Sequence, residues 1–186
     1  FLNTEFSLEN LKTQRQITPY RIIHLGTHGE FKPGPAGESY IQLGDNNKLK
    51  LDEIKNLGWN NPPVDLLVLS ACRTAVGDEK AELGFAGLAV AAGVRTAVGS
   101  LWYVSDEGTL GLMTTFYQKL GKYSTKAESL RQTQIDIIKG NVRIQNGQLI
   151  TPEGVFPLPE ELKNIEDKNI SHPYFWSAFT MIGSPW

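Results

Sequence analysis

Apolar runs of two kinds alternate along the chain. Short, continuous runs typical of buried strands lie at residues 20–25, 64–69 and 94–101. Apolar residues at helical spacing mark residues 83–92 and 106–120, and a glycine placed to end a helix follows each of these segments. Because strand, helix and strand follow one another at the spacing of a parallel βαβ unit, the pattern predicts an α/β fold with a mostly parallel central sheet flanked by helices.

Weaker patterns predict the remaining elements. They are a flanking helix capped by Ser7, a hairpin over residues 40–51, a short helix capped by Asp52, a polar helix over residues 124–139 and a last strand over residues 175–182. We expect the strand at residues 20–25 to be central in the sheet. We interpret residues 140–170, which contain three prolines, as an irregular insertion.

Length and composition limit the fold and the partners. With 186 residues and 40% hydrophobic composition, the chain is long enough for one core and short for two, so we expect a single domain over residues 1–186. Its net charge of -2, from 18 basic and 20 acidic residues, lacks the electrostatic pattern of a nucleic-acid or membrane binder. The expected partner is therefore a protein or peptide substrate.

The single cysteine cannot form an internal disulfide, which favours a reducing compartment and so the cytoplasm. The apolar runs fall short of the roughly 18–20 residues that span a bilayer. Because the sequence begins at Phe1 rather than methionine, we expect it to be a piece of a longer polypeptide.

A thiol and an imidazole follow two of the predicted strands. His28 follows the strand at residues 20–25, and Cys72 ends the strand that begins at Val64. If these strands are parallel neighbours, both side chains lie at the same edge of the sheet, where α/β proteins collect their chemistry. An imidazole there can take the thiol proton and later protonate a leaving amine, which is peptidase-type acyl transfer. The backbone N–H groups of Gly29 and Cys72 are the candidate oxyanion donors.

Other interpretations of these residues stay open. A lone cysteine at a strand end is more often inert core than a nucleophile, and a histidine beside a glycine is more often merely exposed. The joint placement favours catalysis, since the histidine lies 44 residues upstream (72 minus 28), close to the roughly 50 typical of caspases. We interpret His24 as a core histidine and His172 as part of a turn. The sequence has neither metal-ligand spacing nor a phosphate loop, so we expect no metal and no cofactor.

Five blocks of sequence carry a resemblance to a known family. They are Ile-Ile-His-Leu-Gly-Thr-His-Gly-Glu-Phe at 22–31, Leu-Ser-Ala-Cys-Arg-Thr-Ala-Val-Gly at 69–77, Gly-Phe-Ala-Gly-Leu-Ala at 84–89, Gly-Ser-Leu-Trp-Tyr-Val-Ser-Asp at 99–106 and His-Pro-Tyr-Phe-Trp-Ser-Ala-Phe at 172–179. Together they resemble the CHAT domain, a caspase-like domain often found with tetratricopeptide repeats and similar to caspases and separases. The resemblance implies a caspase-haemoglobinase fold, His28 as general base and Cys72 as nucleophile. It also implies tetratricopeptide repeats or another sensor upstream.

The resemblance also bears on specificity. Metacaspases place an aspartate two residues before the nucleophile, but Ser70 stands there in this chain. Residues 101–106 are similar to a separase stretch whose acidic residue receives the substrate arginine, which makes Asp106 the candidate S1 carboxylate; the alternative is that Asp106 only caps the helix it begins. Arg73 is expected to be structural.

The leading hypothesis is therefore a cysteine endopeptidase with a His–Cys dyad that cleaves after Arg or Lys. The alternatives are a non-catalytic caspase-like signalling or interaction module and a thiol-dependent acyl hydrolase or acyltransferase.

Overall fold

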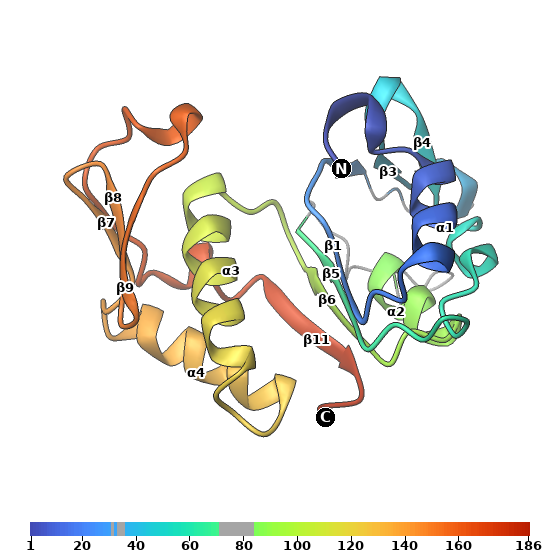
Figure 1. The fold of residues 1–186 in the computed structure, drawn as a ribbon. Helices are drawn as coiled ribbons and strands as arrows, with labels where there is room; N and C mark the ends of the chain where they lie inside the picture. The colour runs from blue at the N-terminus through green and yellow to red at the C-terminus, as the bar shows by residue number, and fades with distance from the viewer. Residues whose placement is uncertain (31, 33–35, 71–83) are drawn as a thin grey trace. The chain divides into compact units, whose positions relative to one another are not determined.

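The structure, a computed structural model, describes residues 1–30, 32, 36–70 and 84–186. Its contacts divide the chain into two compact units (Figure 1). The first contains Phe1–Tyr103 and Phe179–Ser184, and the second contains Val104–Ala178 and Pro185–Trp186.

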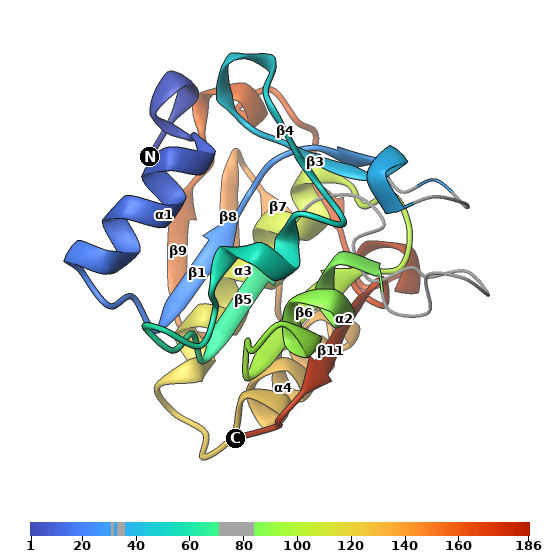
Figure 2. The ribbon, with the colours of Figure 1, turned by 90° about the vertical axis from the view of Figure 1, so that its right-hand side faces the viewer.

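A four-stranded sheet organises the first unit. Its strands are β1 (Ile22–Leu25), β5 (Leu66–Leu69), β6 (Thr96–Ser100) and β11 (Phe179–Gly183), in the order β1-β5-β6-β11 (Figure 2). β1, β5 and β6 are parallel, and β11 is antiparallel to β6. The predicted mostly parallel sheet is thus confirmed.

The expectation that the strand at residues 20–25 is central is wrong, because β1 lies at the edge of this sheet. Burial explains the difference. In β1 only alternate residues, Ile23 and Leu25, are buried, whereas all four residues of β5 are buried. A strand that buries one face and exposes the other tolerates an edge position, and the β-branched composition of residues 20–25 did not reveal this.

Helices α1 (Leu8–Ile17) and α2 (Gly84–Ala91) contribute to the core on one side of this sheet. Phe85 of α2 is buried with Leu67 and Leu69 of β5. The Ser7 hydroxyl accepts a hydrogen bond from the Asn10 amide at 3.1 Å, which confirms the predicted cap of α1.

A small antiparallel sheet completes the first unit. It contains β2 (Gly29–Glu30), β3 (Tyr40–Gln42) and β4 (Lys48–Lys50), so the predicted hairpin is confirmed and gains a third strand. Short 3-10 helices are η1 (Asn3–Glu5), η2 (Ala36–Glu38), η3 (Gly44–Asn46) and η4 (Ile54–Leu57). The prediction that Asp52 caps η4 is wrong. A turn occupies residues 51–53, so the residue at the N-cap of η4 is Glu53, and its side chain forms no capping hydrogen bond.

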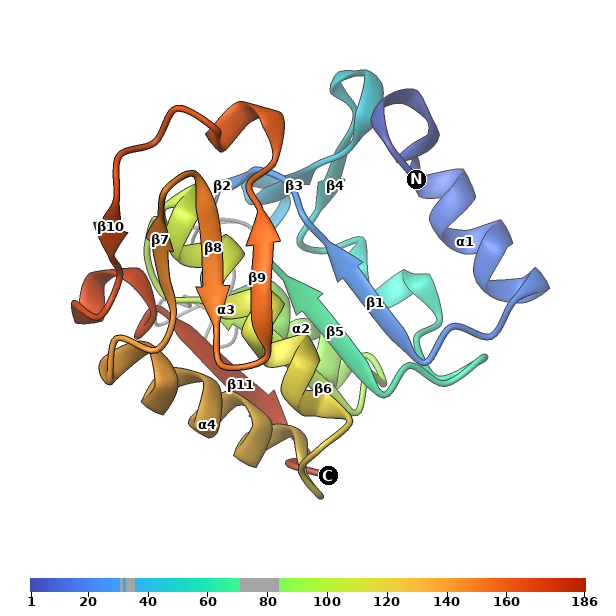
Figure 3. The same cartoon turned by 60° about the vertical axis from the view of Figure 1, so that its left-hand side comes forward.

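The second unit pairs two helices with an antiparallel sheet (Figure 3). The helices are α3 (Asp106–Leu120) and α4 (Lys126–Ile138), both close to their predicted ranges. The sheet has the order β10-β7-β8-β9 and contains β7 (Arg143–Gln145), β8 (Gln148–Thr151), β9 (Gly154–Pro157) and β10 (Lys168–Asn169). The 3-10 helices η5 (Glu160–Leu162) and η6 (Pro173–Phe175) complete the unit.

Residues 140–170 are therefore not irregular, although whether they are an insertion stays a prediction. The turn at Asn146 and Gly147 joins β7 to β8, and both residues have positive φ angles, of 53° and 68°. An Asn-Gly pair is the usual choice where both turn residues need positive φ. The strands it joins are only three and four residues long, too short for a clear alternating pattern.

One buried ion pair links α3 to α4. Lys119 is 5% exposed, and its Nζ lies 2.7 Å from an Asp136 carboxylate oxygen. Desolvation by burial opposes ionisation of Asp136, but hydrogen bonds from Lys119 and Asn141 outweigh it and lower the pKa of this carboxyl group. The charge of each partner compensates that of the other in a site with little access to water.

Replacement of one partner should therefore be costly. We expect Asp136→Asn to lower the free energy of unfolding by about 3–5 kcal/mol, because it leaves the Lys119 ammonium buried and uncompensated. Urea denaturation at pH 7 measures this. The control is Arg131→Gln, which breaks an exposed ion pair with Glu128 on α4 and should have little effect. Equal losses in the two variants would contradict this account.

The effect of Asp136→Asn should also depend on pH. Because a lowered carboxyl pKa stabilises the folded state above the unfolded-state pKa, the loss of unfolding free energy in Asp136→Asn should shrink as the pH falls through the folded-state pKa of Asp136.

Candidate active site

The sheet order brings the ends of β1 and β5 together. The two strands are parallel neighbours, with Leu25 aligned to Leu69, and the Ser70 amide extends the ladder by donating to the Leu25 carbonyl at 3.2 Å. His28 follows β1 by three residues at this edge. Cys72 and Arg73, which follow β5, lie outside the described residues. The condition set from sequence, that the two strands be parallel neighbours, is confirmed.

The backbone at His28 is fixed by β3. The Thr27 hydroxyl donates to the Gln42 carbonyl at 2.8 Å, and the Gln42 amide donates to the His28 carbonyl at 2.8 Å. The Gln42 side chain in turn donates to the carbonyls of Leu43 and Asn47, at 3.0 and 2.9 Å. Sequence reasoning missed Gln42, because its hold on residues 27–28 runs through its backbone and leaves no signature in residue type.

The His28 side chain is exposed, and it forms no hydrogen bond or ion pair with the residues that the structure describes. A general base must have a free ring nitrogen within reach of the proton it takes. The imidazole of His28 meets the first part of this requirement, and it lies on a segment that two hydrogen bonds tie to Gln42 of β3.

Gly29 opens β2 opposite Ile41 of β3. Because the hydrogen bond on one side of this pair runs from the Gln42 amide to the His28 carbonyl, Gly29 and Ile41 form a non-hydrogen-bonded pair. The Gly29 N–H therefore points away from β3. An N–H that the ladder does not use is a suitable donor to an oxyanion.

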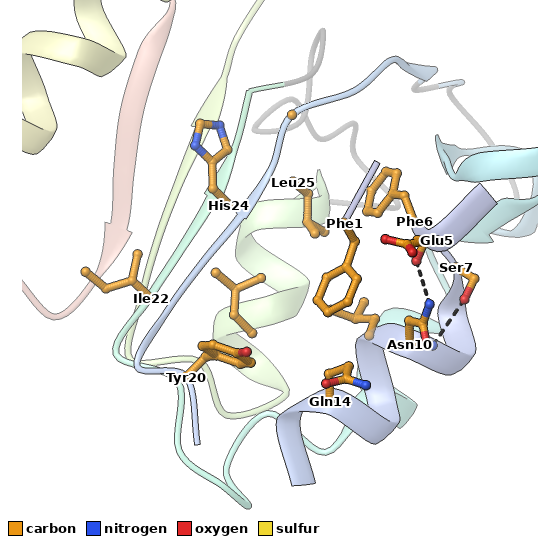
Figure 4. Close-up of a pocket in the computed structure, with 13 residues that line it drawn as sticks. Phe1, Glu5, Phe6, Ser7, Asn10, Gln14, Tyr20, Ile22, His24 and Leu25 are labelled. Atoms are coloured by element: carbon orange, nitrogen blue, oxygen red, sulfur yellow. Dashed lines mark hydrogen bonds between the residues drawn. The ribbon is translucent and has the colours of Figure 1, made fainter. Parts of the chain in front are cut away.

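A second histidine, His24, contacts Ser70 at the same edge. His24 Nε2 lies 2.6 Å from Ser70 Oγ, and a Cβ added at Gly26 would come within 3.4 Å of this hydroxyl. The interpretation of His24 as a core residue is wrong, since it projects from β1 on the side opposite the buried Leu25 (Figure 4). Desolvation of the ring lowers the pKa of His24, which favours a neutral imidazole. This pair ties β1 to the residue just after β5.

A pocket of about 230 Å³ lies between α1 and β1 (Figure 4). Phe1, Phe6 and Asn10 line it from the N-terminal side, and Tyr20 and Leu25 line it from the β1 side. Its lining does not include His28. We therefore place the candidate chemistry at the strand ends and not in this pocket.

Asp106 is the first residue of α3, but it does not cap the helix. The N-cap is Ser105, whose hydroxyl accepts a hydrogen bond from the Gly108 amide at 3.1 Å. Asp106 is exposed, and no described residue forms a hydrogen bond or ion pair with its carboxylate. The alternative in which Asp106 serves only as a cap is wrong, and its carboxylate is accessible to a ligand. Asp106 belongs to the second unit and His28 to the first.

His172, interpreted from sequence as part of a turn, is the N-cap of η6, and its ring nitrogen accepts from the Tyr174 amide at 3.2 Å. Within the described ranges, no group of three or more His, Cys, Asp or Glu residues is arranged to hold a metal ion. Among the same residues, no helix combines the length with the apolar character that a membrane span requires.

Because Ser105 caps α3 and Asp106 does not, substitutions of these two residues should differ in their effect on stability. We expect Ser105→Ala to lower the free energy of unfolding by about 1 kcal/mol, because the Gly108 amide loses its partner. Asp106→Asn should cost less than about 0.5 kcal/mol, since an exposed residue loses only its favourable interaction with the helix dipole. Thermal and urea denaturation of the two variants measure both values. A larger loss in Asp106→Asn than in Ser105→Ala would show that Asp106 is the cap after all.

Comparison with known proteins now identifies the family. No curated protein matches the chain. The family model of the CHAT domain matches residues 1–184, which is almost the whole sequence. The match agrees with the mixed α/β fold, with the mostly parallel sheet of the first unit and with the blocks at the ends of β1 and β5. The chain therefore belongs to the CHAT domain family, a peptidase-related family of caspase-like domains.

Proposed function

We propose that this domain is a cysteine endopeptidase of caspase-haemoglobinase fold, with His28 as general base and Cys72 as nucleophile. One observation carries the proposal: β1 and β5 are parallel neighbours, so the segments that contain the two residues leave the sheet at the same edge. The exposed imidazole of His28, without a partner among the described residues, adds support. A reducing compartment such as the cytoplasm suits an enzyme that depends on a free thiol.

The proposed reaction has two stages. His28 takes the proton from Cys72 Sγ, and the thiolate attacks the carbonyl carbon of the scissile peptide bond. The N–H groups of Gly29 and Cys72 donate to the resulting oxyanion. His28 then gives its proton to the leaving amine as the C–N bond breaks, which leaves a thioester on Cys72. In the second stage His28 deprotonates a water molecule, whose oxygen attacks the thioester carbonyl carbon. The C–S bond then breaks, the acid product leaves, and His28 returns its proton to the Cys72 thiolate.

Specificity is proposed to reside in Asp106, with cleavage after Arg or Lys. An arginine guanidinium can form two parallel hydrogen bonds with a carboxylate, and this geometry discriminates against neutral side chains. Two observations support this: Asp106 is exposed, and the side chain that caps the helix is that of Ser105 and not that of Asp106. We also propose that tetratricopeptide repeats or another sensor accompany this domain in a longer protein.

Hydrolysis of fluorogenic peptides tests the proposal. The wild-type protein should cleave an arginyl reporter and should ignore the matched aspartyl reporter. Cys72→Ala should abolish cleavage and also labelling by an arginyl acyloxymethyl ketone. His28→Asn should lower kcat by about 10²–10⁴, because it removes the general base but leaves the thiol.

Circular dichroism and thermal denaturation show whether these variants keep the fold. Undiminished turnover in folded Cys72→Ala would exclude the dyad. A wild-type protein that neither cleaves nor is labelled would favour a non-catalytic interaction module. Turnover of small acyl esters with no turnover of peptides would instead favour an acyl hydrolase.

A further inference from the structure

The first turn of α3 carries two neighbouring acidic residues with opposite surroundings. Asp106 is exposed and has no partner among the described residues. The Glu107 side chain is only 13% exposed and forms an ion pair with Lys168 of β10. Of the two adjacent carboxylates, Glu107 is thus half-buried and paired with a lysine, and Asp106 is exposed and accessible.

Several groups hold the Glu107 carboxylate. Desolvation opposes its ionisation, but hydrogen bonds from Lys168, from the Glu107 backbone amide and from Ser105 outweigh that cost and lower the pKa of Glu107. Ser105 is also the N-cap that accepts from the Gly108 amide. Lys168, Glu107 and Ser105 therefore form one connected network on both sides of Asp106.

Packing fixes the same turn from another direction. A Cβ added at Gly108 would lie 2.7 Å from the Phe175 carbonyl oxygen, so the helix lies directly against η6. Lys168 Nζ lies 5.8 Å from the centre of the Phe175 ring. Lys168 is itself held in the sheet by the pairing of β10 with β7, opposite Ile144. The turn that carries Asp106 is thus tied to β10 by charge and to η6 by close contact.

We propose that Lys168 and Glu107 are positioning residues that hold Asp106 in place to bind the guanidinium group of an arginine side chain. The proposal rests on the proposed role of Asp106 in substrate binding. First turns of helices fray, and a two-bond contact between a guanidinium and a carboxylate requires a fixed carboxylate plane. The network supplies this rigidity, and the Lys168 ammonium compensates the charge of Glu107, so that a single carboxylate remains for the ligand.

Binding to a protein that cannot turn over tests the proposal. The Cys72→Ala protein is titrated with N-acetyl-arginine amide and, separately, with N-acetyl-citrulline amide, which has nearly the same shape but no charge; NMR chemical shifts report both. Adding Lys168→Met should weaken binding of the arginine amide about tenfold and leave the citrulline amide unchanged, since only the charged ligand uses Asp106. Lys168→Arg should restore arginine binding, because it keeps the charge at this position.

A matched control removes a different lysine of the same unit. Lys163→Met breaks an exposed ion pair with Glu160 in η5 and should leave binding of both ligands unchanged. Equal binding of the arginine amide with and without Lys168→Met would overturn the proposal, as would a parallel loss for both ligands, which would indicate general disruption. Failure of the parent Cys72→Ala protein to bind the arginine amide would overturn it too. The peptidase proposal is decided separately, by hydrolysis of the arginyl reporter.

Discussion

The parallel pairing of β1 with β5 is the constraint on which the candidate site depends. The register aligns Ile22 with Leu66 and Leu25 with Leu69, and a shift of one residue would turn every side chain of β1 to the opposite face. Asp65 reinforces the pairing at the start of the strands, where its carboxylate forms an ion pair with Arg21. The same carboxylate forms an ion pair with Arg95, which precedes β6. At the other end, His24 and Ser70 are joined by a side-chain contact. The pairing is therefore secured where the strands begin and where they end.

The proposed general base and the proposed binding carboxylate both lie on segments that neighbouring residues hold in place. His28 lies in a segment whose backbone is tied to Gln42 of β3, while its ring is exposed. Asp106 lies on a helix turn that Ser105, Glu107 and Lys168 hold. In both places the chain fixes the backbone and leaves the functional side chain without a described partner. Rigid support for a side chain that meets the substrate is what preorganised sites require.

Much of this arrangement could be predicted from the sequence, because continuous apolar runs and helical spacing are local signals. The apolar spacing and Gly121 predict a helix over residues 106–120, which is the range of α3 in the structure. The position of a strand within the sheet is harder to predict. A β-branched run at residues 20–25 favours a central strand, but it carries no information on which strands lie beside it, and β1 lies at the edge. The network of Glu107 and Lys168 joins residues 61 positions apart, and such pairs have no signature in local pattern. Ser105 and Asp106 are both good capping residues, so only the geometry could decide which one caps α3.

If His28 acts on Cys72, the reactivity of the thiol should depend on this histidine. Because the chain has a single cysteine, the rate of alkylation by iodoacetamide as a function of pH reports the pKa of Cys72 without interference. We expect the thiol pKa to lie well below the usual value of about 8.5 in the wild-type protein and to return towards that value in the His28→Asn variant. The same alkylation profile in both proteins would contradict it.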